Sequence, residues 1–351
     1  MKTWDVIVVG GGIVGLSLAI SLRRHGAQVL VVERGEPGRE ASHAAAGMLA
    51  DLDAHTPEAL RPLAVASARM YPEFVHDVQD ESGSNVDLRD HGTIYFPAPN
   101  VTLGAMAAEM TDGEKLKELE PCLSYRGVAV YLKERSVDPR ALMAALLKAA
   151  KHREVEIASG MAASELMVKD ASTQGLKTVK TEFHAPVVVN CAGAWARDFG
   201  PGTVPTKPVK GQMLALVAHR RDLLRHVVRG PEVYVVPRSD GRIVVGSTLE
   251  HAGFDKRVTP ETVQRLHQKA AEMAPDLGQA RMLEAWAGLR PGTPDDLPIL
   301  GRGVVDGYFV ATGHYRDGIL LAPITAEVMT QMIRGVQPEF DLSAFSPQRF
   351  K

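Results

Sequence analysis

The sequence has very little cysteine: Cys122 and Cys191 are the two thiols in 351 residues. Two cysteines cannot build the several disulfides on which small secreted domains depend, and they supply too few ligands for a cysteine-based metal site. We therefore expect two reduced thiols in a cytosolic protein, with no disulfide framework and no bound metal.

Long apolar runs and long basic runs are also missing. The first residues, "MKTWDVIVVGGG", hold one lysine and a short apolar run that breaks into glycines, which does not match a secretory signal. No stretch approaches the ~20 apolar residues that a membrane helix needs. The formal net charge of -2 argues against a nucleic-acid partner. We expect a cytoplasmic protein with no membrane span and no nucleic-acid partner.

What the sequence does have is the length and composition of a globular protein with a large core. Hydrophobic residues make up 45% and charged residues 23% of the 351 residues, which suggests two domains without internal repeats. The chain opens with a strand at Asp5–Val9, a helix at about Ile13–His25 and a strand at Gln28–Glu33. This order predicts a parallel, doubly wound α/β sheet.

A glycine motif spans the turn between that first strand and the start of the helix that follows. Gly10, Gly12 and Gly15 form G-x-G-x-x-G, in which the first glycine permits the tight turn and the second lets the backbone approach a pyrophosphate. The third lets helix and strand pack closely, and the helix then offers free N–H groups to the phosphates. The pattern alone is weak, but its position inside a βαβ unit indicates a dinucleotide site.

The residue that ends the second strand is Glu33, which can accept hydrogen bonds from both ribose hydroxyls of an adenosine. A 2′-phosphate would be repelled there, so NADP is disfavoured. NAD and FAD share the pattern. The position of the motif near the start of the chain, and the lack of a second complete G-x-G-x-x-G, favour FAD.

The rest of the chain alternates between two textures. One helix is predicted from Thr56, with Pro57 in its first turn. Another is predicted after Asp138, which would cap it. "VVV" at Val187–Val189 predicts a buried central strand, and residues 212–250 are rich in strands, two of them joined by the hairpin sequence "SDG". We predict a discontinuous, Rossmann-like FAD-binding domain of the glutathione reductase type, joined to a largely antiparallel, β-rich substrate domain. Their ranges are 1–82, 138–212 and 289–351 for the first, and 83–137 and 213–288 for the second.

Five segments carry a family resemblance: "SHAAAGML", "NCAGAWA", "KGQ", "AGLRPGTPDDLPILG" and "GHYRDGILLAP". Together they resemble the glycine oxidase/D-amino acid oxidase group of flavoproteins, and most closely its ThiO-type glycine oxidases. The resemblance implies FAD bound non-covalently. Related sarcosine oxidases attach flavin through a cysteine, and "AGLRPGTPD" contains none.

The resemblance also implies which residues border the cofactor. A weaker implication is a main-chain contact to adenine near Glu165. We expect the helix after Gly318 to aim its positive end at the flavin ring, where charge accumulates on reduction. The expected cofactor-binding residues are Gly10, Gly12, Ile13, Val14, Gly15, Glu33, Arg34, Ser42, Ala45, Ala46, Gly47, Met48, Ala192, Gly193, Trp195, Gly313, His314, Tyr315, Arg316, Asp317, Gly318, Ile319 and Leu320.

Five residues are substrate-binding candidates. The resemblance places Arg290 at the substrate carboxylate, which a guanidinium can hold by two parallel hydrogen bonds. The sequence without the resemblance favours a solvated surface arginine after a strand. Tyr234 would face the same carboxylate or pack in the core. Arg316 would lie near substrate or flavin, or pair with Asp317. Met48 and Leu249 would form apolar walls.

The implied reaction is the oxidation of a small amino acid by hydride transfer to the flavin, with oxo acid, ammonia and H₂O₂ as products and O₂ as acceptor. It needs orientation more than a catalytic acid or base. Glycine as substrate, a role in thiazole synthesis and a tetrameric assembly rest on the resemblance. The alternatives are a D-amino acid or sarcosine oxidase or dehydrogenase, and a flavin-binding protein without catalysis.

The chain departs from the group at several positions near the expected pocket. Asp317 stands where asparagine is usual, Glu232 where a histidine can occur, and Ala50 and Asp53 lie in a loop where small neutral residues are expected. Extra negative charge there predicts that acidic substrates are disfavoured.

Overall fold

The structure is a computed structural model that describes residues 2–51, 53, 56–99, 101, 110–111, 113–124 and 128–350. Its first sheet has six strands in the order β19-β20-β13-β1-β2-β9. All neighbours are parallel except β19 and β20. The strands are β1 (Val6–Val9), β2 (Val29–Glu33), β9 (Glu156–Ser159), β13 (Val187–Asn190), β19 (Ile299–Arg302) and β20 (Tyr308–Thr312).

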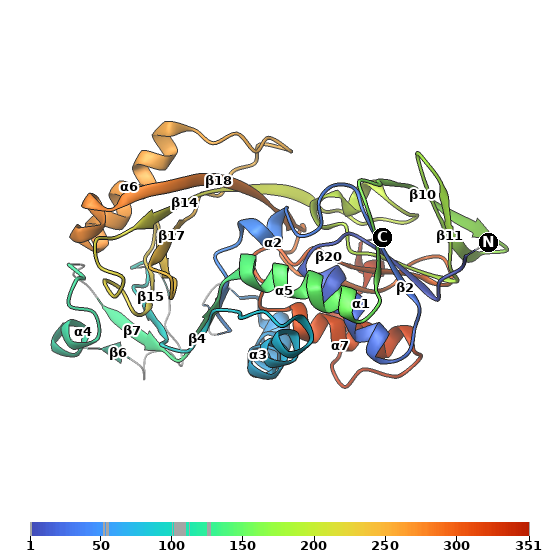
Figure 1. The fold of residues 1–351 in the computed structure, drawn as a ribbon, viewed down its shortest axis with the longest axis horizontal. Helices are drawn as coiled ribbons and strands as arrows, with labels where there is room; N and C mark the ends of the chain where they lie inside the picture. The colour runs from blue at the N-terminus through green and yellow to red at the C-terminus, as the bar shows by residue number, and fades with distance from the viewer. Residues whose placement is uncertain are drawn as a thin grey trace.

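Alternate residues of these strands feed two different cores. One face of the sheet packs against four helices, and this cluster contains Val6, Val8, Val29 and Val31. Ile7 and the other residues that alternate with these valines along the strands join a second cluster on the opposite face. That opposite face is covered by a three-stranded sheet of β10 (Ala163–Lys169), β11 (Ser172–Thr178) and β12 (Glu182–His184). Figure 1 shows the helices gathered on one side: α1 (Ile13–Arg24), α3 (Arg61–Ser82), α5 (Pro139–His152) and α7 (Ala322–Ile333).

The second large sheet has eight strands in the order β18-β14-β17-β16-β15-β5-β7-β6 and is antiparallel except between β15 and β5. One face packs on α6 (Pro260–Met273) and η4 (Pro275–Gln279). The two long strands, β14 and β18, lie side by side (Figure 1). They extend from the half of the molecule that holds the eight-stranded sheet toward the half that holds the six-stranded sheet and its helices. The strands are β5 (Thr93–Tyr95), β6 (Met110–Thr111), β7 (Ala129–Leu132), β14 (Lys207–Val217), β15 (Val227–Arg229), β16 (Tyr234–Pro237), β17 (Arg242–Gly246) and β18 (Arg281–Gly292).

The remaining elements are short. A small antiparallel sheet has the order β3-β8-β4. The remaining elements are α2 (Ala41–Ala44), β3 (Met48–Leu49), η1 (Glu58–Leu60), β4 (Leu88–Arg89), α4 (Gly113–Leu119), β8 (Arg135–Val137), η3 (Gly193–Asp198), η5 (Ser343–Phe345) and η6 (Pro347–Arg349).

The predicted α/β class and the opening strand, helix and strand are confirmed. Asp138 caps α5, with its carboxylate accepting from the N–H of Arg140 at 2.9 Å. "SDG" turns β16 into β17, since the N–H of Arg238 donates to the carbonyl of Arg242 at 2.8 Å. The domain boundaries stay a prediction; those near 213 and 289 fall inside the continuous strands β14 and β18.

Two predicted helix starts are wrong, both because of proline. The helix predicted from Thr56 begins at Arg61, with Pro62 in its first turn, where a missing N–H costs nothing. The helix predicted near Gly318 begins at Ala322. A helix starting at Gly318 would place Pro323 beyond the first turn, where its ring would clash and its N–H would be missing. Residues 318–321 form a separate turn instead.

No helix within the described residues is long and apolar enough to cross a membrane.

Candidate active site

One cavity of about 680 Å³ runs from the glycine turn after β1 to the near end of the eight-stranded sheet. A volume of roughly 300–1,000 Å³ is typical of cofactor and ligand sites. Most predicted site residues line it: Gly10, Gly12, Ile13, Val14, Glu33, Arg34, Ser42, Ala45, Ala46, Gly47, Met48, Ala192, Gly193, Trp195, Tyr234, Leu249, Arg290, His314, Tyr315, Arg316, Asp317, Gly318 and Ile319.

Three predicted cofactor residues lie elsewhere. At Gly15 a side chain would run into the Gly10 carbonyl and Val8, so this glycine serves the packing of α1 on β1. At Gly313, where φ is +74°, a side chain would meet Thr293 and Ile299 rather than the cavity. Leu320 is buried in the helical core. Glu165 is exposed and pairs with a lysine on β11, and the cavity is lined instead by Ala162 and Ala163.

The glycine turn and the start of α1 form one end of the cavity. Gly10 has φ of +109°, and a side chain there would collide with the Cys191 carbonyl. Gly12 leaves the first amides of α1 without a side-chain cap of its own, although Ser42 Oγ accepts from the Ile13 N–H at 3.0 Å. Uncapped amides at a helix N-terminus suit a pyrophosphate.

Glu33 lies beside this turn with a carboxylate that can still accept further hydrogen bonds. Its Oε2 accepts from the Gly11 N–H and its Oε1 from the Gly35 N–H, each at 2.8 Å. A carboxylate oxygen accepts two hydrogen bonds, so each atom retains one site for a ribose hydroxyl. Arg34 stacks on the ring of Trp195 at 3.6 Å from its centre. These residues fit the adenosine pyrophosphate part of FAD.

Arg290 on β18 forms the other end of the cavity. Its Nη1 donates to the Thr248 carbonyl at 3.2 Å and its Nη2 donates to Ser247 Oγ at 2.5 Å. Each terminal nitrogen carries two hydrogens, so one on each remains for a ligand. Among the described residues no carboxylate lies within ion-pair distance of this guanidinium. The half-buried Arg290 can therefore receive a carboxylate in two-point geometry.

Two glycines inside strands make this geometry possible, and sequence reasoning gave them no role. A side chain at Gly211 on β14 would collide with the Arg290 guanidinium, and one at Gly246 on β17 would meet the Tyr234 ring. A glycine within a strand often marks such a close approach. Gly211 lies in "KGQ" and Gly246 in "VVGST", so the signal was present in the sequence.

Tyr234 points to the face of the sheet that its alternation predicts. Val233 and Val235 pack in the core under α6, whereas Tyr234 packs with Met48 and Met213 on the cavity side. Its hydroxyl lies 3.8 Å from Met213 Sδ, a weak acceptor. The phenol therefore keeps its capacity to bind a ligand.

The loop after β20 brings four polar or aromatic residues to the cavity. His314 is buried, and burial lowers its pKa to about 4, so the ring is neutral at neutral pH. Its Nε2 lies 3.0 Å from Thr325 Oγ1. Arg316 is exposed and lies over the Tyr315 ring at 5.1 Å, and no ion pair with Asp317 is found among the described residues. Burial and the charge of Asp53 raise the pKa of Asp317 to about 7, against the opposing charge of Arg316.

A buried arginine that sequence reasoning missed lies on the same wall. Arg229 donates to Asp53 Oδ2 at 2.7 Å and to Glu134 Oε1 at 3.0 Å, and its guanidinium lies 5.0 Å from the Tyr95 ring centre. Glu232 is paired too, with Lys269 at 2.8 Å. Two of the three extra acids named from the sequence are thus matched by bases, which leaves Asp317 as the one without an ion pair among the described residues.

Comparisons with known proteins identify the family of the chain. The family model DAO, described as FAD dependent oxidoreductase, matches residues 5–332. A glycine oxidase of Pseudomonas aeruginosa is 33% identical, over 97% of this chain and 98% of its own. The bifunctional protein ThiO/ThiG of Synechocystis is 36% identical over 99% of this chain, which spans about half (54%) of that relative. The crystal structure of glycine oxidase from Geobacillus kaustophilus has a TM-score of 0.94, with 30% identity and 99% of each chain covered.

The family match covers the segments from which the resemblance was inferred, and FAD as the cofactor is confirmed. The glycine turn, Glu33 and the cavity give the same cofactor a physical basis in this chain. The chain belongs to the DAO family of FAD-dependent oxidoreductases, and glycine oxidases are among its relatives.

Proposed function

We propose that the protein catalyses the FAD-dependent oxidative deamination of glycine and other small amino acids or amines. The products would be an oxo acid, ammonia and H₂O₂. One observation carries the proposal: a half-buried guanidinium, Arg290, faces the same cavity as the dinucleotide turn and has one free N–H on each terminal nitrogen. A cavity that offers both a flavin site and a carboxylate site suits an amino acid.

Arg290 would hold the substrate carboxylate through two parallel hydrogen bonds, and the Tyr234 hydroxyl would donate a third. Bound FAD supplies an electrophilic N5 that accepts hydride and a reduced ring that O₂ reoxidises. Non-covalent binding is proposed because Cys122 packs against the core of the eight-stranded sheet and the segment around Arg290 contains no cysteine. Cys191 lines the cavity, but burial raises the pKa of its thiol, which disfavours the nucleophilic thiolate.

The other cavity residues would orient the substrate and exclude water. Met48 and Leu249 line the cavity as apolar walls, and the neutral His314 adds no charge beside the ring. Arg316 is exposed at the cavity and would attract the anionic substrate. We assign no side chain as a general base, since the amine is able to lose hydride from Cα once it is neutral and oriented.

Several finer points belong to the proposal. They are O₂ as acceptor, a role in supplying an imine for thiazole synthesis, a homotetramer and a cytoplasmic location. D-Amino acid or sarcosine oxidation, with O₂ or another acceptor, is the nearest alternative in chemistry. A flavin-binding protein without catalysis is the alternative of another class.

The test of the activity is anaerobic reduction of the bound flavin, followed by its absorbance. Glycine, sarcosine, D-alanine, D-proline and larger D-amino acids would be compared, with D-glutamate as the acidic member. We expect bleaching by glycine and the small amines, and weaker bleaching by D-glutamate. Failure of every compound would exclude an amino acid oxidase, and equal rates for glycine and D-glutamate would refute the charge discrimination predicted from the extra acids near the pocket.

Arg290→Ala tests the carboxylate site. We expect the variant to remain yellow, with normal FAD content, and to lose substrate affinity by a factor of about 100 or more, because a charge-assisted pair is removed. Steady-state KM and the flavin spectrum are the measurements. Unchanged KM would show that the carboxylate binds elsewhere.

A further inference from the structure

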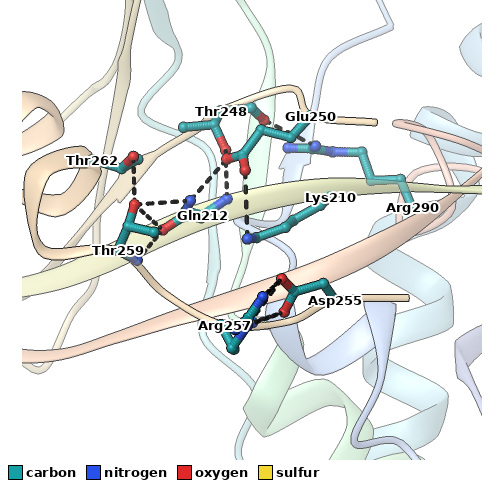
Figure 2. A network of polar contacts seen from close by, with 9 residues as sticks. All are labelled: Lys210, Gln212, Thr248, Glu250, Asp255, Arg257, Thr259, Thr262 and Arg290. Carbon is teal, nitrogen blue, oxygen red and sulfur yellow. Dashed lines mark hydrogen bonds and ion pairs between the residues drawn. The ribbon is translucent and has the colours of Figure 1, made fainter. Parts of the chain in front are cut away.

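A network of polar side chains lies behind Arg290, on the face of β14 that is turned away from the cavity (Figure 2). Lys210 and Gln212 on β14 alternate with Gly211, over which the Arg290 guanidinium lies, so their side chains point to the opposite face. Glu250 follows β17, and Thr259 precedes α6. None of these four polar residues lines the cavity.

Thr248 connects the network to Arg290. Its carbonyl accepts from Arg290 Nη1 at 3.2 Å, while its hydroxyl points into the network. That hydroxyl donates to Glu250 Oε1 at 2.5 Å and accepts from the Gln212 N–H at 2.9 Å. Figure 2 shows the contacts of Thr248 with both Glu250 and Arg290 as dashed lines. The backbone oxygen that directs Arg290 is thus fixed by the side chain of the same residue.

Glu250 is the residue on which the other members converge. Its Oε1 also accepts from Gln212 Nε2 at 2.9 Å, and its Oε2 lies 3.4 Å from the Nζ of the buried Lys210. Gln212 is fixed in turn, because its Oε1 accepts from the Thr259 N–H at 2.8 Å. Burial alone would raise the pKa of Glu250, but donation from Thr248 and Gln212 and the charge of Lys210 hold it below its usual range. The carboxylate is ionised at neutral pH.

We propose that Glu250 is a positioning residue for Arg290: through Thr248 it fixes the direction in which the guanidinium presents its two free N–H groups. This rests on the proposed function, in which Arg290 binds the substrate carboxylate. An arginine side chain has many rotamers, and two-point binding requires the planar fork to face the ligand. Glu250 acts at a distance from the ligand, since Thr248 stands between Glu250 and Arg290.

The experiment measures binding of glycolate, which has the carboxylate of glycine and a hydroxyl in place of the amine. The dissociation constant is obtained from the change in the visible spectrum of the FAD-loaded protein. The variants are Glu250→Ala, Glu250→Gln, Thr248→Val and Arg290→Lys, with Glu250→Ala also combined with Arg290→Lys. Thr262→Val is the matched control, because its hydroxyl contacts Thr259 at the outer end of the network, away from Arg290.

We expect Glu250→Ala and Thr248→Val to weaken glycolate binding about tenfold, as for loss of a hydrogen bond to a charged group. Glu250→Gln retains a carbonyl oxygen for Thr248 and should restore most of the affinity. In the Arg290→Lys background Glu250→Ala should have no further effect, since its target is already gone. Thr262→Val should bind as the parent does, and FAD content should stay constant in all variants.

The outcomes separate the two proposals. If Arg290→Lys leaves glycolate binding unchanged, the carboxylate site itself is misassigned and the inference fails with it. If Arg290→Lys weakens binding but Glu250→Ala and Thr248→Val do not, the proposed function stands and the positioning role is overturned. Additive effects of Glu250→Ala and Arg290→Lys would also overturn it. If Glu250→Ala does not fold, Thr248→Val carries the same comparison, because its side chain is nearly isosteric.

Discussion

Asp317 is the acid at the candidate site whose charge is least compensated. Burial and the neighbouring Asp53 raise its pKa to about 7, and Arg316 opposes this shift from an exposed position. Asp53 itself pairs with Arg229. When folding raises the pKa of an acid, ionisation of that acid destabilises the folded state. The destabilisation grows as the pH rises from the unfolded-state pKa to the folded-state pKa, and it is constant above the latter. The cost is therefore absent at low pH and complete above about pH 7.

Asp317→Asn removes that ionisation without changing the size of the side chain. We expect its melting temperature to exceed that of the parent by about 2 °C or more at about pH 8, and by clearly less near about pH 5, where only part of the cost has accumulated. Differential scanning fluorimetry at both pH values measures the difference. Asp255→Asn is the control: its partner Arg257 lowers the pKa of Asp255 to about 2, so its effect should be the same at both pH values. A pH-independent gain for Asp317→Asn would refute the raised pKa.

The residue scale is also where sequence reasoning was most uneven. Glu33 and Tyr234 could be placed because motif and alternation fix where such side chains point, whereas Arg290 was named from the family resemblance. Arg229 could not, because its partners Asp53 and Glu134 are far away in the chain and only the fold brings them together. The same holds for Thr248, because its carbonyl meets Arg290 only once the sheet has formed.

Among the elements, the segment between β17 and α6 contacts both ends of the cavity. Its first residues hold Arg290, and further along Phe254 stacks on Trp195 with ring centres 5.1 Å apart and planes 21° from parallel. Arg34 lies on Trp195 as well, at 3.6 Å from the ring. Lys256 pairs with Glu40 at 3.0 Å. The segment therefore connects the substrate-side sheet to the wall beside Glu33.

These contacts predict a role in retaining the cofactor. Phe254→Ala should speed FAD dissociation several-fold, because Trp195, on which Arg34 lies, loses a stacking partner worth about 1 kcal/mol. The rise of free-flavin fluorescence after dilution measures the rate. Val304→Ala, an exposed apolar residue that does not line the cavity, is the control. Identical rates in the parent and Phe254→Ala would show that the stack covers no part of the cofactor.

Among the helices and strands, the buried strands were predicted best. The strands β1, β2, β13 and β20 are apolar runs between turns, so their existence follows from composition. The strands β9 ("EIAS") and β19 ("ILGR") are of mixed composition, and neither was predicted. The first residues of helices were harder to predict. Pro57 and Pro62 could each lie in the first turn of α3, and the sequence does not say which one does. For α7, Pro323 lies in the first turn, which sets the start of the helix later than predicted. The three-stranded sheet of β10, β11 and β12 escaped because its strands mix exposed and buried positions without strict alternation, and its register shifts.

At the scale of the whole molecule, buried contacts tie the two halves together. Arg238, the residue after β16, is buried and donates to the Ala46 carbonyl at 2.5 Å and to the Val137 carbonyl at 3.1 Å. Trp286 on β18 donates to the Ala44 carbonyl at 3.1 Å. An unsatisfied buried carbonyl costs roughly 1–3 kcal/mol, so separating the halves is expensive. The two halves should therefore unfold together.

FAD binding should then protect strands that it does not touch. At a free FAD concentration of one hundred times Kd, ligand binding stabilises the folded state by about 2.7 kcal/mol. If unfolding is cooperative, amides of β7, none of which lines the cavity, should exchange about 100-fold more slowly with FAD, as should those of β13. Hydrogen-exchange mass spectrometry compares the two peptides. Protection of β13 without protection of β7 would show that the two halves unfold independently. Arg238→Met should reduce the protection of β7 by FAD relative to that of β13, because it removes the buried hydrogen bonds to the carbonyls of Ala46 and Val137.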